Sequence, residues 1–67
     1  MVLIHYNIGM NPQEIRALRY KLGLTQIQLA DKLGVTNMSI HKWEHGISNP
    51  HKVFAAMLEE LAIEQKN

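Results

Sequence analysis

Apolar side chains recur every three or four residues in four successive stretches of the chain, and short polar or glycine-containing segments separate these stretches. This spacing is typical of amphipathic helices that each bury one face. The pattern therefore predicts an all-α fold, a compact bundle of four or five helices. The inward positions that it predicts are Ile15, Leu18, Leu22, Leu29, Ala30, Leu33, Val35, Ile40, Trp43, Val53, Phe54, Met57, Leu58 and Leu61.

Capping residues predict the ends of the first helix. Asn11 is a favourable N-cap, Pro12 suits the first helical position, and Glu14 occupies the third. Gly23 then provides a left-handed stop.

Similar signals bound the next two helices. Thr25, with Gln28 three residues later, is a capping-box pattern, and Gly34 gives the following turn its backbone freedom. Thr36 is the expected cap of the third helix, which is expected to end at Gly46.

The fourth helix is expected to begin at Asn49 and Pro50. Residues 11–63 would then form one domain, with an arm or short strand at 1–10 and a tail at 64–67.

The first residues of the chain have a different composition. Residues 2–8 are rich in β-branched and aromatic side chains and end at Gly9, which is typical of a short β-strand. A lone strand has unpaired edges, so an ordered arm would need a partner such as the same arm of a second copy. The alternative is a frayed tail.

Composition narrows the class of protein. A chain of 67 residues is one domain near the lower size limit for independent folding, and the absence of cysteine excludes disulfides and thiolate metal sites. Residues 16–52 hold six basic and two acidic residues, a net charge of +4, whereas residues 53–67 have a net charge of −2. This asymmetry suggests an anionic partner at one face. With no signal peptide and no apolar run of membrane-spanning length, a cytoplasmic protein is expected.

Residues 24–46 predict two short helices joined by a tight turn, the arrangement of a helix-turn-helix that places its second helix in the DNA major groove. Asn37 can pair with adenine, Lys42 can donate to guanine, and Met38 can pack against a thymine methyl group. The candidate base-reading residues on the outward face are Asn37, Met38, Ser39, His41 and Lys42.

Phosphate contacts are expected at the starts of the two helices. A helix N-terminus offers free N–H groups and a partial positive charge, so Thr25 and Thr36 mark candidate phosphate sites. Gln26 would add a side-chain donor. Such contacts would position the domain without reading sequence.

The same residues resemble the Cro/C1-type helix-turn-helix family of phage repressors, bacterial regulators and antitoxins. The resemblance covers residues 15–61 and implies a lambda-repressor-like fold. The matching residues are Leu18-Arg19, Gly23-Leu24-Thr25-Gln26, Leu29-Ala30, Leu33-Gly34-Val35-Thr36, Ile40, Trp43-Glu44 and Gly46.

The resemblance implies individual roles in DNA binding. Gln26 corresponds to the family's phosphate-binding glutamine, and Asn37, Met38 and Lys42 correspond to its base-reading positions. His45 stands where the family usually has an asparagine that touches the DNA backbone.

The resemblance also implies a structural salt bridge between Arg19 and Glu44, for which the alternative is two unrelated surface charges. Two departures from the family pattern stand out. The loop at 47–49 has none of the usual basic residues, which leaves Lys52 as the nearby cation, and Ile27 stands where the family is usually polar.

Other functions fit less well. His41 and His45 share a helix face, but the glutamate beside the second histidine is not the zinc-protease arrangement, so no metal site is expected. The sequence contains neither a glycine-rich phosphate loop nor a nucleophile with a plausible base, so no enzyme activity is expected. No cofactor is expected either. The runner-up is a protein-binding adaptor or antitoxin that presents Ile27, Ile47 and the surface of the fourth helix to a toxin, a polymerase or another regulator.

The sequence therefore predicts a DNA-binding transcription regulator. A repressor is expected, which binds an inverted repeat as a homodimer because one short helix reads few bases. The dimer surface would come from the fourth helix with Ile63, from the N-terminal arm, or from both.

Overall fold

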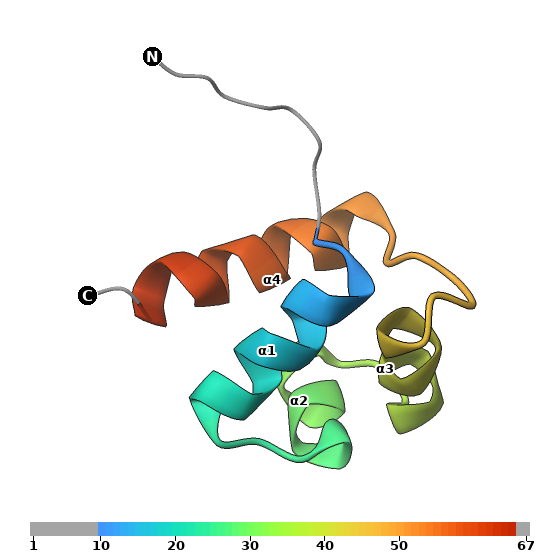
Figure 1. The fold of residues 1–67 in the computed structure, drawn as a ribbon, viewed down its shortest axis with the longest axis horizontal. Helices are drawn as coiled ribbons and strands as arrows, with labels where there is room; N and C mark the ends of the chain where they lie inside the picture. Colours follow the sequence, from blue (N-terminus) through green and yellow to red (C-terminus); the bar gives the residue numbers. More distant parts are fainter. Residues whose placement is uncertain (1–9, 66–67) are drawn as a thin grey trace.

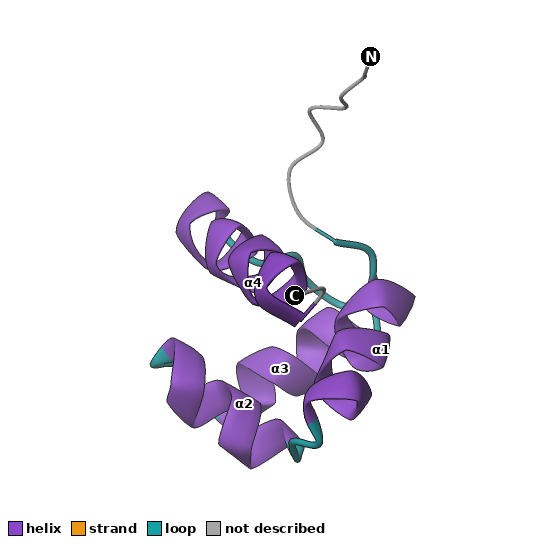
Figure 2. Cartoon of the chain, turned by 90° about the vertical axis from the view of Figure 1, so that its left-hand side faces the viewer, coloured by secondary structure: helices purple, strands orange, loops and turns teal. Residues whose placement is uncertain are grey.

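The computed structural model describes residues 10–65 of the chain. Within this range the chain forms the helices α1 (Pro12–Leu22), α2 (Gln26–Leu33), α3 (Asn37–Glu44) and α4 (Lys52–Gln65). Helices α2 and α3 pack together, and α1 packs against both α3 and α4 (Figure 1; Figure 2). The predicted all-helical fold is confirmed for the described residues. Of the arm predicted at residues 1–10, residues 1–9 lie outside the described range.

Capping boxes begin the first two helices, at the two N-caps that the sequence predicted. The amide of Glu14 donates to Asn11 Oδ1 at 2.8 Å, and the amide of Asn11 donates to Glu14 Oε1 at 2.9 Å. Thr25 and Gln28 exchange the same pair of bonds, at 3.1 and 2.9 Å. Each box satisfies two helix-terminal N–H groups, so these helix starts are determined by local chemistry.

Left-handed residues end the same two helices. Gly23 has φ 72° and donates its N–H to the carbonyls of Arg19 and Tyr20. Because a side chain is strained at this φ, glycine allows only three residues to separate the end of α1 from the start of α2.

The core forms where the inward faces of all four helices meet. Its best-buried side chains come from every helix. The ring centroids of Trp43 and Phe54 lie 6.0 Å apart, and this aromatic contact joins α3 to α4. The buried apolar residues are Ile15, Leu18, Leu29, Ala30, Leu33, Ile40, Trp43, Ala55 and Leu58. One continuous core of this kind is what holds so short a chain together.

The predicted start of the fourth helix is wrong by two residues. Helix α4 begins at Lys52, and the carbonyl of His51 is its first acceptor, 2.9 Å from the amides of both Phe54 and Ala55. Asn49 and Pro50 belong to the connection from α3. The helix then extends to Gln65, past the domain boundary expected at residue 63.

The predicted apolar stripe of α4 is also wrong at one position. Val53 is 60% exposed, whereas Ala55, which the pattern passed over, is buried. Val53 and Ile63 each lie five residues from the buried Leu58, which places them about 140° around the helix from it. Both therefore point away from the core, and Ile63 is 61% exposed.

Substitutions on α4 test this assignment. Leu58→Ala should lower the free energy of unfolding by about 3 kcal/mol, because it leaves a cavity in the core. Val53→Ala should change it by less than about 0.5 kcal/mol, because the side chain is exposed. Urea unfolding followed by helical circular dichroism measures both, and a similar loss in the two variants would contradict the assignment.

Candidate nucleic-acid interface

The outward face of α3 carries the predicted base-reading residues. Asn37, His41 and Lys42 are exposed, and Met38 is 54% exposed. Their positions are held because Ile40 and Trp43 anchor the opposite face of the same helix in the core. Four of the five candidates thus share an accessible face on a fixed element.

Ser39 differs from the other four. It is half-buried, and its hydroxyl lies 3.2 Å from Thr36 Oγ1, which also accepts the Ser39 amide at 3.2 Å. The two hydroxyls are therefore partly engaged with each other at the N-terminus of α3.

The N-terminus of α2 lies beside that face. The Thr25 hydroxyl accepts the amide of Gln28, so its oxygen already has a partner. Gln26 is half-buried, and its Nε2 donates to Glu44 Oε1 at 3.2 Å. This bond joins the start of α2 to the end of α3 and orients the Gln26 amide.

The structure brings Arg19 and Glu44 together in a bidentate ion pair. Arg19 Nε donates to Glu44 Oε2 at 2.6 Å, and Arg19 Nη2 donates to Glu44 Oε1 at 2.9 Å. The third nitrogen, Nη1, donates to the carbonyl of Leu24 at 3.1 Å. All three guanidinium nitrogens are thus used to tie α1 to α3 and to the turn before α2.

The sequence analysis missed Arg16. Its Nη2 donates to the main-chain carbonyl of Glu44 at 2.6 Å, and its Nε lies 3.8 Å from Glu44 Oε1. The positive charge of Arg16 at this carbonyl also interacts favourably with the negative, C-terminal end of the α3 dipole. Its spacing of three from Arg19 was the available signal, because such residues share a helix face.

The ion pair changes the proton affinity of both partners. Burial by itself would raise the pKa of Glu44, but hydrogen bonds from Arg19 and Gln26 and the charges of Arg19 and Arg16 lower the pKa below its usual value. The hydrogen bond to Glu44 raises the pKa of Arg19, although burial opposes this. Glu44 therefore remains ionised inside the protein.

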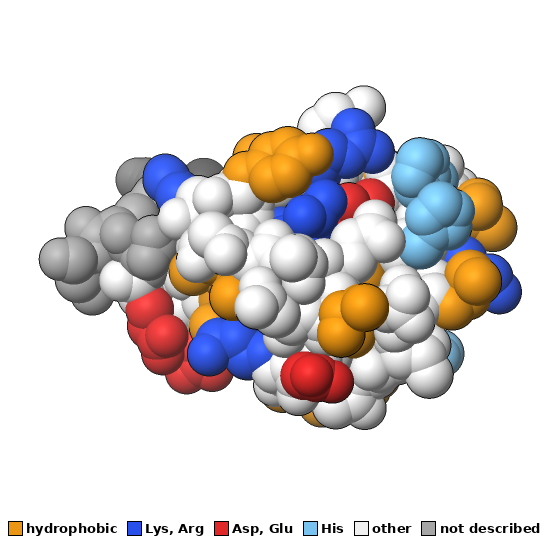
Figure 3. All heavy atoms as spheres, turned by 90° about the horizontal axis from the view of Figure 1, so that it is seen from below, with side chains coloured by type: hydrophobic (Ala, Val, Ile, Leu, Met, Phe, Trp, Pro, Cys, Tyr) orange, Lys and Arg blue, Asp and Glu red, His pale blue; other side chains and the backbone are white. Residues whose placement is uncertain are grey.

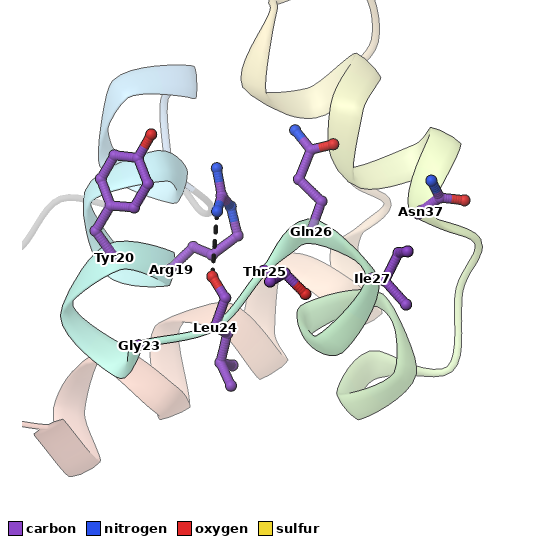
Figure 4. Close-up of a pocket in the computed structure, with 8 residues that line it drawn as sticks. All are labelled: Arg19, Tyr20, Gly23, Leu24, Thr25, Gln26, Ile27 and Asn37. Atoms are coloured by element: carbon purple, nitrogen blue, oxygen red, sulfur yellow. Dashed lines mark hydrogen bonds between the residues drawn. The ribbon is translucent and has the colours of Figure 1, made fainter.

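A shallow depression of about 570 Å³ lies where the end of α1 and the starts of α2 and α3 meet (Figure 4). It brings Gln26 and Thr25, expected at phosphates, onto one surface with Asn37, expected at a base. Its other lining residues are Arg19, Tyr20, Gly23, Leu24 and Ile27.

The surrounding surface is mixed in character. Figure 3 looks onto the side of the molecule that lies lowest in Figure 1, and shows arginine or lysine side chains around a small acidic spot with histidines beside them. The rings of His41 and His45, both exposed, have centroids 4.2 Å apart. Across residues 10–65, no three histidine, cysteine or acidic side chains are grouped to hold a metal.

The two remaining phosphate candidates lie past the C-terminal end of α3. His45 is exposed at the C-cap of that helix, and Lys52 is exposed at the first position of α4. The loop between them carries Ile47, which is also exposed.

The ion pair should make stability depend on acid pH. Because the folded-state pKa of Glu44 is lowered, its contribution is complete above the ordinary glutamate value of 4.5 and is lost as the pH falls through the folded value. Glu44→Gln should lower the unfolding free energy by about 3 kcal/mol at neutral pH. The loss should shrink below about pH 5.

Urea unfolding at a series of pH values measures this difference. The control is Glu64→Gln, at an exposed position of α4, which should have an effect of less than about 0.5 kcal/mol. A Glu44→Gln loss that stays constant from neutral to acid pH would contradict the assignment.

Among the described residues, no helix is long and apolar enough to cross a membrane.

Comparison with known proteins identifies the family of this chain. No curated protein and no solved structure gives a significant match to the chain. A helix-turn-helix family model matches residues 15–61, more than half of the chain, and confirms the resemblance. The chain therefore belongs to the Cro/C1-type helix-turn-helix family, a family of DNA-binding regulators.

Proposed function

We propose that this protein is a sequence-specific transcription regulator that reads bases with α3. The observation that carries the proposal is the division of α3 into two faces. Ile40, Trp43 and Glu44 are buried against the other helices, while Asn37 and Lys42 are exposed and held one turn apart. A helix fixed in this way can present side chains to the major groove without first becoming ordered.

The exposed side chains have complementary chemistry for base edges. Asn37 offers the donor and acceptor that pair with adenine, and the Lys42 ammonium can donate to O6 and N7 of guanine. Met38 is apolar and suits the methyl group of thymine, and His41 reaches from the next turn. Ser39 has a weaker claim because its hydroxyl contacts Thr36.

Phosphate contacts would place α3 in register. Gln26 and Thr25 are at the start of α2, and Thr36 is at the start of α3, where free N–H groups favour an anion. His45 and Lys52 would contact the backbone from the other end of α3. These contacts add affinity but little sequence preference.

A homodimer on an inverted repeat follows from the small size of α3. Its eight residues reach few base pairs, and two copies would read two half-sites about 34 Å apart. The exposed Ile63 of α4 is one candidate for the dimer surface. We propose that the protein acts as a repressor in the cytoplasm, because a bound dimer blocks a promoter without any cofactor. By analogy with the family, it would also regulate its own expression.

A protein-binding adaptor or antitoxin module is the second candidate. Two exposed isoleucines favour it, Ile27 on α2 and Ile47 after α3, at 60% and 64% exposure. Such side chains are common in contacts with another protein, including a toxin. In that case variants of Asn37 and Lys42 would retain activity.

The deciding experiment is selection of bound duplexes from a random library by the purified protein at physiological salt. An enriched inverted repeat supports a dimeric, sequence-specific regulator. If no motif is enriched and binding disappears as salt rises, only non-specific attraction remains, and the adaptor becomes the better explanation.

The double variant Asn37→Ala with Lys42→Ala tests base reading. It should weaken binding to the selected operator at least about 30-fold, because two base contacts are lost. Binding to an unrelated duplex should fall much less. The control is Lys32→Ala, which removes a charge from the α2 surface that faces α4. Equal losses on both duplexes in gel-shift titrations would contradict base reading.

Gln26→Ala tests the phosphate contact. It should weaken binding to the operator and to the unrelated duplex by a similar factor of about tenfold, because phosphate is common to both. Thermal unfolding must be measured beside it, since Gln26 also donates to Glu44. A loss confined to the operator would argue that Gln26 reads sequence.

A further inference from the structure

Tyr20 is an exposed aromatic residue at the C-terminal end of α1. Its side chain is 66% exposed and lines the depression that also contains Thr25, Gln26 and Asn37. Neither hydrogen bond between Arg19 and Glu44 involves its hydroxyl group. A hydrogen bond with Tyr20 is a lesser cause of the raised pKa of Arg19, after the hydrogen bond to Glu44.

The ring of Tyr20 is held in place by its neighbour. The guanidinium carbon of Arg19 lies 4.8 Å from the ring centroid, a cation–π distance. Arg19 is in turn fixed by Glu44 and the Leu24 carbonyl. In Figure 4 the Tyr20 hydroxyl, the Arg19 guanidinium and the Gln26 amide extend to the same side of the ribbon. The hydroxyl thus lies on the same side of the depression as the Gln26 amide, with the Arg19 guanidinium between them.

The charge of this surface suits an anion. Among the described residues that line the depression, none carries a carboxylate. Glu44 lies close behind Gln26, but its side chain is only 1% exposed and both Arg16 and Arg19 contact it. The net charge of Arg16, Arg19 and Glu44 together is +1, and the positive, N-terminal end of the α2 dipole lies beside them.

We propose that the Tyr20 hydroxyl donates a hydrogen bond to a DNA phosphate on the strand that Gln26 contacts. The contact would extend the DNA-binding surface from α2 and α3 onto α1. The inference rests on the proposed DNA-binding function and adds a residue to it. Because a phosphate is the acceptor, Tyr20 contributes affinity on any sequence.

Tyr20→Phe tests the hydroxyl alone, because it keeps the ring that covers Arg19. Binding to the operator and to an unrelated duplex at low salt should each weaken about tenfold, the usual effect of one hydrogen bond to a charged group. The thermal midpoint should not change. Gln13→Ala, at an exposed position near the start of α1, is the control and should bind like the wild type.

Replacing single phosphates of the operator with neutral methylphosphonates locates the contact. One replacement should weaken the wild type strongly and Tyr20→Phe much less, since that variant has already lost the bond. Equal effects at every phosphate in the two proteins would overturn the inference.

The two proposals fail in different ways. If Tyr20→Phe binds both duplexes like the wild type while Gln26→Ala weakens, Tyr20 has no phosphate contact and the proposed function stands. If no operator is selected, sequence-specific regulation is wrong. The unrelated duplex then still tests Tyr20, and an unchanged affinity there overturns the inference.

Discussion

The buried carboxylate of Glu44 is the group on which the arrangement of the first three helices depends. It accepts a bidentate bond from Arg19 on α1 and a bond from Gln26 on α2, while it belongs to α3 itself. Arg16 binds the carbonyl of the same residue. Removing one partner would leave the other charge uncompensated in the interior. The resulting loss of stability would be much larger than the net stabilisation that the intact pair provides. The network therefore restricts α3 to one orientation relative to α1 and α2.

That restriction connects the fold to the proposed DNA contacts. A helix of eight residues is marginal in isolation, so α3 depends on tertiary packing for its conformation. Ile40 and Trp43 supply the apolar part of that packing, and Glu44 supplies the polar part. Because these groups occupy one face, the side chains on the other face need no packing partner. The identity of these exposed residues can therefore vary to suit the hydrogen-bonding groups of different base edges without loss of packing.

The network also links the two kinds of DNA contact that we propose. Gln26, expected at a phosphate, is joined to the end of α3 through Glu44, and Tyr20 is joined to it through Arg19. A duplex held by these residues would meet α3 at a defined depth and angle. Preorganisation of this kind reduces the ordering cost of binding. Helix α4 supports the scaffold from the far side and carries the acidic end of the chain.

Sequence by itself determined the features that depend on neighbours along the chain. The capping boxes at Asn11 and Thr25 and the stop at Gly23 involve residues within a few positions of each other, so their chemistry was visible in one dimension. Helical periodicity also identified most of the core. The candidate contacts of α3 followed from the same pattern and stay predictions, because their partner is a separate molecule.

Tertiary structure decided what depends on the approach of separate helices. Periodicity placed Val53 in the core of α4, but only the direction from which α1 and α3 approach shows that Ala55 is buried there instead. The hydrogen bonds from Arg16 and Gln26 to Glu44 span 28 and 18 residues, so no local pattern identifies Glu44 as their partner. In the sequence Tyr20 is an ordinary outward position, and only the fold places it at the same depression as Gln26. Local patterns specify which face of a helix is apolar, whereas packing geometry specifies which side chains meet.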